Sequence, residues 1–347
     1  MRVAIIGCGL IGQKRAKTLP PDVKLAAVAD TNHPRAQQLA AQSPGCEVEP
    51  DWQSCVTRAD VDAVVVSTVN AALAQVTLAA VRQGKHVLVE KPAARNADEL
   101  RPVGPASRRS GVFVKVGFNH RFHPAFLKAR ALCDAGELGP LLYIRARYGH
   151  GGRFGYDREW RADPVVAGGG ELLDQGVHLI DLSRWFLGDF VEVQGHIATY
   201  FWKMPVEDNG FLSLRTAHGR MAWLHASCTE WKNLFSFEIF GRDGKLQIDG
   251  LGGSYGVERL SFYRMLPQMG PPETTIWEYP GEDQSWRTEF DHFHECIAAG
   301  RQPQGTLEDA LAALEVVEQV YQQNQESPRI TRITRIKEND YQRIMTQ

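Results

Sequence analysis

Residues 1–13 read MRVAIIGCGLIGQ, and this stretch decides the fold. The run 3–6 is short, apolar and mostly β-branched, so it predicts a buried strand, and Gly7-Cys8-Gly9-Leu10-Ile11-Gly12 follows it as a G-x-G-x-x-G motif that opens a helix. Gly7 permits the tight turn, Gly9 lets the backbone approach a pyrophosphate at the helix N-terminus, and Gly12 allows close helix–strand packing. The stretch therefore predicts a dinucleotide-binding loop that Leu10 and Ile11 also border; a plain strand–helix turn is the structural alternative.

The first 120 residues continue this alternation of strand and helix. Short apolar runs predict strands at 3–6, 25–29, 63–67, 87–90 and 112–116, and helical patterns lie between them, including 71–83 and 97–109. Near-continuous apolar strands separated by helices are typical of a parallel sheet covered on both faces. We therefore expect residues 1–120 to form a doubly wound α/β domain of the Rossmann type that binds the dinucleotide.

The pattern changes after residue 121. Helices are predicted at 124–135, 172–187, 285–299 and 307–323, a strand at 141–148, and a loop rich in Gly, Arg and aromatic residues at 149–170. Runs at 191–201, 210–216, 221–228, 235–240, 245–248 and 274–277 predict strands without intervening helices, which favours one antiparallel or mixed sheet. Residues 121–347 are thus expected to form a second, α+β domain, with 329–335 as a peripheral strand or solvated tail.

Bulk composition excludes several classes of function. The 347 residues are 43% hydrophobic and 23% charged with a formal net charge of −2, so there is no basic excess for nucleic-acid binding. The six cysteines form no C-x-x-C pair, which is typical of a reduced, cytoplasmic protein. The N-terminal apolar run is too short for a signal peptide. The sequence contains no run of about 18 apolar residues, so we expect no membrane span.

An acidic residue follows the second predicted strand. Asp30 stands 18 residues after Gly12, where a carboxylate accepts hydrogen bonds from the adenosine ribose hydroxyls and repels a 2′-phosphate. Thr31 borders the same position, and neither it nor Asn32 supplies a positive charge for NADP. We therefore expect NAD as cofactor, with an ordinary turn aspartate as the alternative.

A second motif ends the strand predicted at 87–90. Glu90-Lys91-Pro92 lies at the carboxyl end of that strand, where ligands of open α/β sheets gather. Lys91 is therefore placed to approach the nicotinamide and to exchange a proton with a substrate hydroxyl, and Pro92 fixes the local backbone. A lysine in a surface turn is the alternative.

Taken with a third motif, these residues identify a resemblance. The glycine loop at 7–12, GKHVLVEKP at 84–92 and GGGELLDQGVHLID at 168–181 resemble the glucose–fructose oxidoreductase, inositol dehydrogenase and rhizopine-catabolism (Gfo/Idh/MocA) family in order and spacing over nearly the whole chain. The resemblance implies a Rossmann domain followed by a domain with an open, mostly antiparallel sheet, through which a homodimer or homotetramer assembles.

The resemblance also implies a catalytic trio of Lys91, Asp174 and His178, with His178 as proton acceptor. Asp174 and His178 stand at i and i+4 on the predicted helix, so a carboxylate would stabilise the protonated imidazole. Taken alone, this pair also fits a helix-surface contact or part of a metal site. Because His178 lacks further ligands at a recognisable spacing, we expect no metal.

One segment departs from the family pattern. Relatives often have Thr-Pro-Asn and then His where this chain has Ser67-Thr68-Val69-Asn70 followed by Leu73. Ser67, Thr68 and Asn70 can still line the cofactor, as can Glu90 beside Lys91, which leaves dinucleotide binding in place.

Substrate contacts are expected from two segments and the catalytic helix. Asn119 and Arg121 lie in the stretch that crosses between the domains, where a structural hinge is the alternative. Arg153, Trp160 and Arg161 form a loop that could grip an anion and stack on a sugar ring, or contact another domain or subunit. Gln175 and His178 complete the expected substrate set, and Gln175 is polar where relatives often carry an apolar residue.

The combined expectation is a hydride transfer. The chain should be an NAD-dependent oxidoreductase that acts on a secondary alcohol of a sugar, polyol or sugar nucleotide. Two alternatives remain, an NAD-assisted glycosidase of the same family and a non-catalytic dinucleotide sensor. The Lys91, Asp174 and His178 set argues against the sensor.

Overall fold

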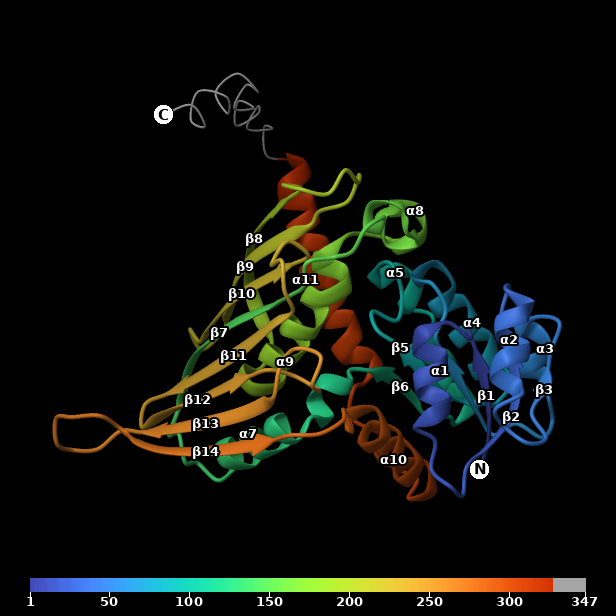
Figure 1. Cartoon of the computed structure of the whole chain (residues 1–347), viewed down its shortest axis with the longest axis horizontal. Coiled ribbons are helices and arrows are strands. Elements are labelled where there is room, and N and C mark those ends of the chain that lie inside the picture. Colours follow the sequence, from blue (N-terminus) through green and yellow to red (C-terminus); the bar gives the residue numbers. More distant parts are fainter. Residues whose placement is uncertain (327–347) are drawn as a thin grey trace.

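The computed structural model describes residues 1–326 and contains two sheets (Figure 1). The N-terminal sheet has six strands in the order β3-β2-β1-β4-β5-β6, all parallel. This is the doubly wound arrangement expected from the sequence, and the predicted strands at 3–6, 25–29, 63–67, 87–90 and 112–116 are confirmed within about two residues. The elements of this half are β1 (Arg2–Ile6), α1 (Leu10–Lys17), β2 (Lys24–Ala29), α2 (His33–Ala40), β3 (Glu47–Val48), α3 (Trp52–Thr57), β4 (Ala63–Val66), α4 (Asn70–Arg82), β5 (His86–Glu90), α5 (Ala97–Leu100), α6 (Val103–Ser110) and β6 (Val114–Gly117).

Two details of this half differ from the sequence prediction. The two-residue strand β3 was missed because it is too short to show a periodicity. The single helix predicted at 97–109 is wrong, since α5 ends at Leu100 and α6 begins at Val103. Pro102 lies between them, and a proline has no backbone N–H to continue a helix.

The second sheet has eight strands in the order β14-β13-β12-β11-β7-β10-β9-β8. Only β7 and β10 pair in parallel, so the sheet is mixed and mostly antiparallel, as expected. The strand β13 was missed in the sequence, because its apolar residues are flanked by charged ones. The strands are β7 (Leu141–Gly149), β8 (Phe190–Ala198), β9 (Asn209–Thr216), β10 (Met221–Ser227), β11 (Leu234–Gly241), β12 (Gly244–Asp249), β13 (Glu258–Arg264) and β14 (Glu273–Tyr279).

The helices of this half lie toward the N-terminal sheet. In Figure 1, α9 (Val177–Leu187) and α11 (Leu307–Glu326) lie between the two sheets, and the opposite face of the eight-stranded sheet carries no labelled helix. The helix α7 (Pro124–Asp134) packs near β12, β13 and β14. One face of the large sheet is therefore covered by helices and the other is open within residues 1–326.

The loop expected at 149–170 contains short helical turns. They are two 3-10 turns, Tyr156–Arg158 and Trp160–Ala162, and the helix α8 (Pro164–Ala167). The helix predicted at 172–187 begins as a π-helical turn, Leu172–Gly176, before α9. Such turns are rare and often occur at functional sites.

The helix α10 (Ser285–Ala298) returns from the large sheet to the N-terminal one. Its Phe290 and Phe293 are fully buried in one cluster with Val3, Ile5 and Leu88 of the N-terminal sheet. The division into domains at residues 1–120 and 121–347 stays a prediction, and α10 packs on the sheet of the earlier segment. The predicted tail at 329–335 lies outside the described residues. No helix within residues 1–326 is long and apolar enough to cross a membrane.

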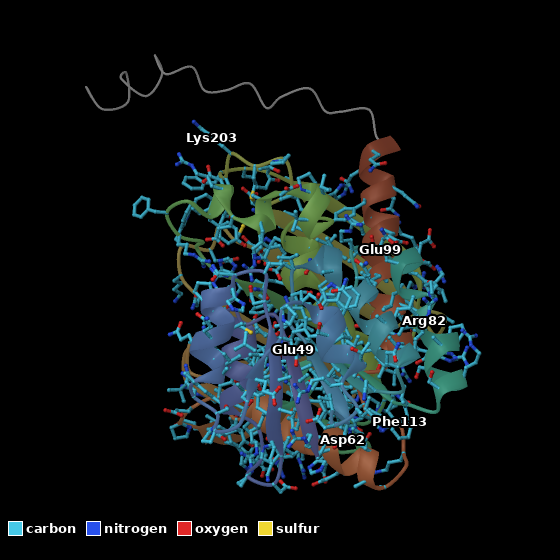
Figure 2. All side chains as sticks on the ribbon, turned by 90° about the vertical axis from the view of Figure 1, so that its right-hand side faces the viewer. Glu49, Asp62, Arg82, Glu99, Phe113 and Lys203 are labelled. Atoms are coloured by element: carbon cyan, nitrogen blue, oxygen red, sulfur yellow. The ribbon has the colours of Figure 1, made fainter. Side chains whose placement is uncertain are left out.

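The carboxyl ends of the parallel strands lie toward one end of the second sheet. In Figure 2, Asp62 and Phe113, which precede β4 and β6, lie near one end of the molecule, and Glu99, which follows β5, lies nearer the other. Lys203, in the connection between β8 and β9, projects at that second end. The carboxyl ends of the N-terminal strands therefore face the loops of the second sheet.

Candidate active site

The glycine loop is closed by its neighbours at two glycines and open at the third. Gly7 has φ +92°, and a Cβ there would lie 2.4 Å from the carbonyl oxygen of Ser67. A Cβ on Gly12 would lie 1.9 Å from the carbonyl oxygen of Gly7, so α1 and β1 pack too closely for any side chain. A Cβ on Gly9 would meet no atom within 4 Å. This open space at the start of α1 fits a pyrophosphate, and Leu10 beside it is 82% exposed.

Asp30 lies directly over this loop. Its Oδ2 accepts a hydrogen bond from the backbone N–H of Cys8 at 2.6 Å, and its Oδ1 accepts one from Asn32 at 2.7 Å. The carboxylate is therefore oriented beside the loop, as a ribose-binding group must be, and Thr31 next to it is exposed. Asn32 caps α2 by accepting from Arg35.

The end of β4 borders the loop from the other side. Ser67 Oγ donates to the carbonyl oxygen of Gly7 at 2.7 Å, and Thr68 Oγ1 donates to the carbonyl oxygen of Val69. Asn70 is buried, and its Nδ2 donates to the carbonyl oxygen of Ala167 at 2.8 Å. Its amide thus joins α4 to α8.

Lys91 and Asp174 meet across the two halves of the chain. Lys91 Nζ lies 2.6 Å from Asp174 Oδ1 and donates to the carbonyl oxygen of Asp174, also at 2.6 Å. Arg161 Nε approaches Asp174 Oδ2 at 3.1 Å. Burial alone would raise the pKa of Asp174, but the positive charges of Lys91 and Arg161 lower it below its usual value.

Glu90 does not point into the same space. Its carboxylate is buried and accepts a hydrogen bond from Arg15 Nε at 2.6 Å. Burial raises the pKa of Glu90. The side chain predicted to bind the cofactor is thus directed into the interior, where it pairs with α1.

His178 is enclosed and lacks the partner expected for it. The residue is 4% exposed, and its Nδ1 has no hydrogen-bond partner within residues 1–326. Burial, followed by the charges of Lys91 and His123, lowers its pKa well below the usual value. Asp174 pairs with Lys91 and Arg161 rather than with His178, so the expected stabilisation of a protonated imidazole by Asp174 is wrong. The π-helical turn interrupts the regular helix on which that expectation depended.

The other predicted substrate residues differ in what they contact. Asn119 Nδ2 donates to Ser285 Oγ at 2.9 Å, which joins the segment that crosses between the sheets to the start of α10. Arg121 is 4% exposed and binds Asp181 through two nitrogens at 2.8 and 2.5 Å, so its guanidinium is held inside the protein.

The four further side chains of this set come from the loop before Asp174 and from the π-helical turn that contains it. Arg153 is exposed and pairs with Glu159 at 2.7 Å. The guanidinium of Arg161 lies 4.6 Å from the ring centre of Trp160. Gln175 is half-buried in the π-helical turn. Trp160 and Arg161 line one small pocket together with Asp174, and Asn70, Glu171 and Met204 also border it.

Several side chains at the site were not singled out in the sequence. His120 stacks on His178, with ring centroids 3.7 Å apart and an interplanar angle of 27°. Glu171 is buried beside Asp174, and His150 Nε2 lies 3.6 Å from its carboxylate. Burial raises the pKa of Glu171 well above the usual value. The segment GFNHRFHP at 117–124 contains His120, but nothing in its spacing indicated a contact with α9.

Within residues 1–326, no group of three or more His, Cys, Asp or Glu side chains is arranged to hold a metal ion.

Comparison with known proteins places both halves of the chain. Residues 1–118 match the family model described as an oxidoreductase family with an NAD-binding Rossmann fold, and residues 126–247 match the GFO/IDH/MocA C-terminal domain. These matches confirm the resemblance seen in the sequence.

Curated relatives cover different shares of the chain. The scyllo-inositol 2-dehydrogenase (NAD(+)) of Bacillus subtilis is 27% identical over 91% of this chain and 92% of its own length. The dTDP-3,4-didehydro-2,6-dideoxy-alpha-D-glucose 3-reductase of Streptomyces violaceoruber is 31% identical over 72% of each chain. Inositol 2-dehydrogenase 2 of Saccharopolyspora erythraea is 33% identical over 63% of this chain, and the match spans 64% of that relative.

Solved structures share the fold. Levoglucosan dehydrogenase in complex with NADH and levoglucosan superposes with a TM-score of 0.83 at 22% identity, over 93% of this chain and 97% of that one. The aldose–aldose oxidoreductase of Caulobacter crescentus complexed with glycerol superposes with a TM-score of 0.81 at 25% identity, over 94% of this chain and 98% of that one.

Proposed function

The chain belongs to the Gfo/Idh/MocA family of NAD-binding oxidoreductases, and from this premise we propose that it oxidises a secondary alcohol of a sugar-like or polyol substrate. The observation that carries the proposal is the contact between Lys91 and Asp174, 2.6 Å long, which joins the end of β5 to the turn before α9. An ammonium group held at the carboxyl edge of a Rossmann sheet is suited to bind a substrate oxygen.

The N-terminal segment 1–120 would hold the cofactor. The open space at Gly9, the oriented carboxylate of Asp30 and the hydroxyls of Ser67 and Thr68 fit the pyrophosphate, the ribose and the border of the nicotinamide site. NAD, when bound, supplies the acceptor for the hydride. Asp30 and the uncharged residues after it favour NAD over NADP.

Proton transfer would fall to Lys91 and His178. Because burial and nearby charges lower the pKa of His178, its imidazole is neutral near pH 7 and can accept the hydroxyl proton. Nδ1 is enclosed, so Nε2 is the nitrogen that can meet a substrate. Asp174 holds the Lys91 ammonium through its carbonyl and carboxylate oxygens, and that ammonium would polarise the same substrate oxygen.

The substrate would bind beside Asp174, where polar and apolar side chains meet. Arg161 and Trp160 border this position, and Gln175 offers an amide in the adjacent turn. Hydroxyl-rich compounds suit such a lining, and relatives named for inositol, levoglucosan and a sugar nucleotide support this class. Arg153 would also contact the substrate. Asn119 and Arg121 would instead support the shape of the site, because their side chains bind Ser285 and Asp181.

The test is a search for NADH formation. The purified protein is incubated with NAD and a panel of polyols, free sugars, sugar nucleotides and glycosides, and the absorbance of NADH and the release of free sugar from the glycosides are followed. Lys91→Ala and His178→Asn should each lower kcat by about 10²- to 10⁴-fold and leave a small residual rate, while NAD binding, measured by calorimetry, is retained. Glycoside cleavage without accumulation of NADH would indicate the NAD-assisted glycosidase, and NAD binding without any reaction would indicate the sensor.

We also propose a homodimer or homotetramer assembled through the open face of the eight-stranded sheet, in the cytoplasm. Exposed side chains on this face include Tyr143, Met221 and Trp223, the last 60% exposed. The six cysteines are free, which suits a reducing compartment. Light scattering of Trp223→Glu should give a smaller particle than the parent protein, and an unchanged particle would exclude this face.

A further inference from the structure

The imidazole of the proposed base, His178, is stacked on a second imidazole. His120, in the segment that crosses between the sheets, lies 3.7 Å from His178 of α9 by ring centroids, at an interplanar angle of 27°. Both are at least 95% buried, with exposed fractions of 5% and 4%. The two rings therefore lie face to face in the interior of the protein.

The surroundings of the pair offer packing rather than hydrogen bonds. Phe118 and Tyr148 meet the His178 ring at their edges, at 6.2 and 6.1 Å between centroids. Tyr148 also meets His120, at 5.2 Å. The Nδ1 atoms of both imidazoles have no hydrogen-bond partner within residues 1–326. Aromatic packing is thus the main contact that determines how the His178 ring is turned.

A histidine that acts as a base is usually oriented by a hydrogen bond from its second ring nitrogen. Two acidic residues lie about one turn from His178, and both are occupied. Asp174 of the preceding turn pairs with Lys91 and Arg161. Asp181 of α9 is bound by Arg121 through two nitrogens. His123 is likewise occupied, since its Nδ1 lies 2.8 Å from Glu258. For Nε2 of His178 to accept a proton, the neutral ring must carry its hydrogen on Nδ1, which faces no acceptor. Something other than a hydrogen bond must hold the ring.

We propose that His120 is a positioning residue that orients the imidazole of His178 by stacking on it, in place of the hydrogen-bonding carboxylate that usually does so. The stack fixes the plane of the ring, and the edges of Phe118 and Tyr148 limit its rotation. His120 takes no proton from the substrate in this scheme. The inference rests on the proposed function, because it assigns His120 a role toward the proposed base.

Burial, followed by the charges of His178, His123 and Lys91, lowers the pKa of His120 well below its usual value. A neutral His120 is consistent with packing and not with carrying charge. A flat, uncharged ring should therefore be able to take over the role of His120, whereas a branched aliphatic side chain of similar volume should not.

The experiment compares His120→Phe, which keeps a flat ring, with His120→Leu, which keeps apolar volume only. We expect His120→Leu to lower kcat about 10- to 100-fold with the KM for NAD unchanged, and His120→Phe to stay within about threefold of the parent, since small misplacements of a base have effects of this size. If His120→Leu does not fold, His120→Met replaces it. The matched control is His86→Phe, because His86 stacks on Phe113 with ring centroids 5.6 Å apart at the start of β5, away from the carboxyl ends of the strands, and the kcat of this variant should not change.

A double substitution separates positioning from general damage. On a His178→Asn background the residual rate should be unaffected by His120→Leu, since there is no base left to orient. Equal losses for His120→Phe and His120→Leu, or a further loss on the His178→Asn background, would overturn the proposal.

A second readout does not depend on turnover. In histidine-labelled protein, the ring-current shift of the His178 Cε1–H resonance should persist in His120→Phe and disappear in His120→Leu. If the parent reduces no NAD with any alcohol, the proposed function fails while this measurement still decides the stacking. An identical His178 resonance in all three proteins would refute the orienting role.

Discussion

Substitution of Arg15 by Met tests whether the buried charges beneath the glycine loop hold the two halves of the chain together. Arg15 of α1 is fully buried; its Nε lies 2.6 Å from Glu90 and its Nη2 lies 2.7 Å from Glu289 of α10. Lys115 of β6, also fully buried, lies 3.3 Å from Glu289. Two cations therefore balance two carboxylates. The contact between Arg15 and Glu289 is close enough for an ion pair but lacks hydrogen-bond geometry.

The magnitude follows from the charge that remains. Arg15→Met keeps most of the side-chain volume but leaves two buried carboxylates facing one lysine, and loss of one partner from a buried pair costs about 3–5 kcal/mol. The double substitution Arg15→Met with Glu90→Gln restores the balance between Lys115 and Glu289. It should therefore be more stable than the single variant.

The assay is urea unfolding followed by tryptophan fluorescence at pH 7 and pH 5.5. Without Arg15 the pKa of Glu90, already raised by burial, rises further in the folded state. When the pKa of a carboxyl group is higher in the folded than in the unfolded state, the free energy of unfolding decreases as the pH increases. The stability difference between Arg15→Met and the parent should therefore be smaller at pH 5.5 than at pH 7. A loss below about 1 kcal/mol at pH 7, or a double variant no more stable than the single one, would refute the reasoning.

The remaining predictions concern the cofactor loop and the proposed base. Gly12→Ala should abolish NAD binding and destabilise the fold, because its Cβ would lie 1.9 Å from the carbonyl oxygen of Gly7. Gly9→Ala has open space around the new Cβ, so this variant should fold normally and bind NAD more weakly. Thermal melting compares the stability of the two variants, and calorimetry compares their affinity for NAD. Asp30→Ser should weaken NAD binding about tenfold and reduce the preference for NAD over NADP, measured as the ratio of the dissociation constants for the two cofactors. An unchanged ratio would contradict the assignment of Asp30 to the ribose. Since the pKa of His178 lies well below 6.5, its neutral form persists as the pH falls, so the acid limb of kcat/KM should lie below pH 6.5; a limb centred at pH 7 or above would contradict this.

Local sequence features were sufficient to predict the N-terminal half. The strand before Gly7, the glycine spacing and the acidic residue at position 30 act over a few residues, and a buried parallel strand is visible as a short apolar run. The structure confirms these elements. Where the signal is weak, as in the two residues of β3 or the charged ends of β13, the strand exists only because a neighbouring strand pairs with it.

The site shows the same division. Lys91 and Asp174 could be proposed from motifs, and the structure brings them within 2.6 Å. Their separation of 83 residues gives no sign of which group faces which. That Asp174 pairs with Lys91 and Arg161 and not with His178 depends on a π-helical turn, which no residue pattern predicted.

The sequence by itself therefore determined the type of the N-terminal sheet, the dinucleotide loop and the residues able to perform proton chemistry, because short-range sterics and hydrophobic periodicity encode them. Only the tertiary structure decided that α10 returns to the first sheet, that Arg15 joins Glu90 to Glu289, and that His120 lies on His178. Such contacts join residues far apart in the chain, and the folding of the whole molecule, rather than any local preference, selects them.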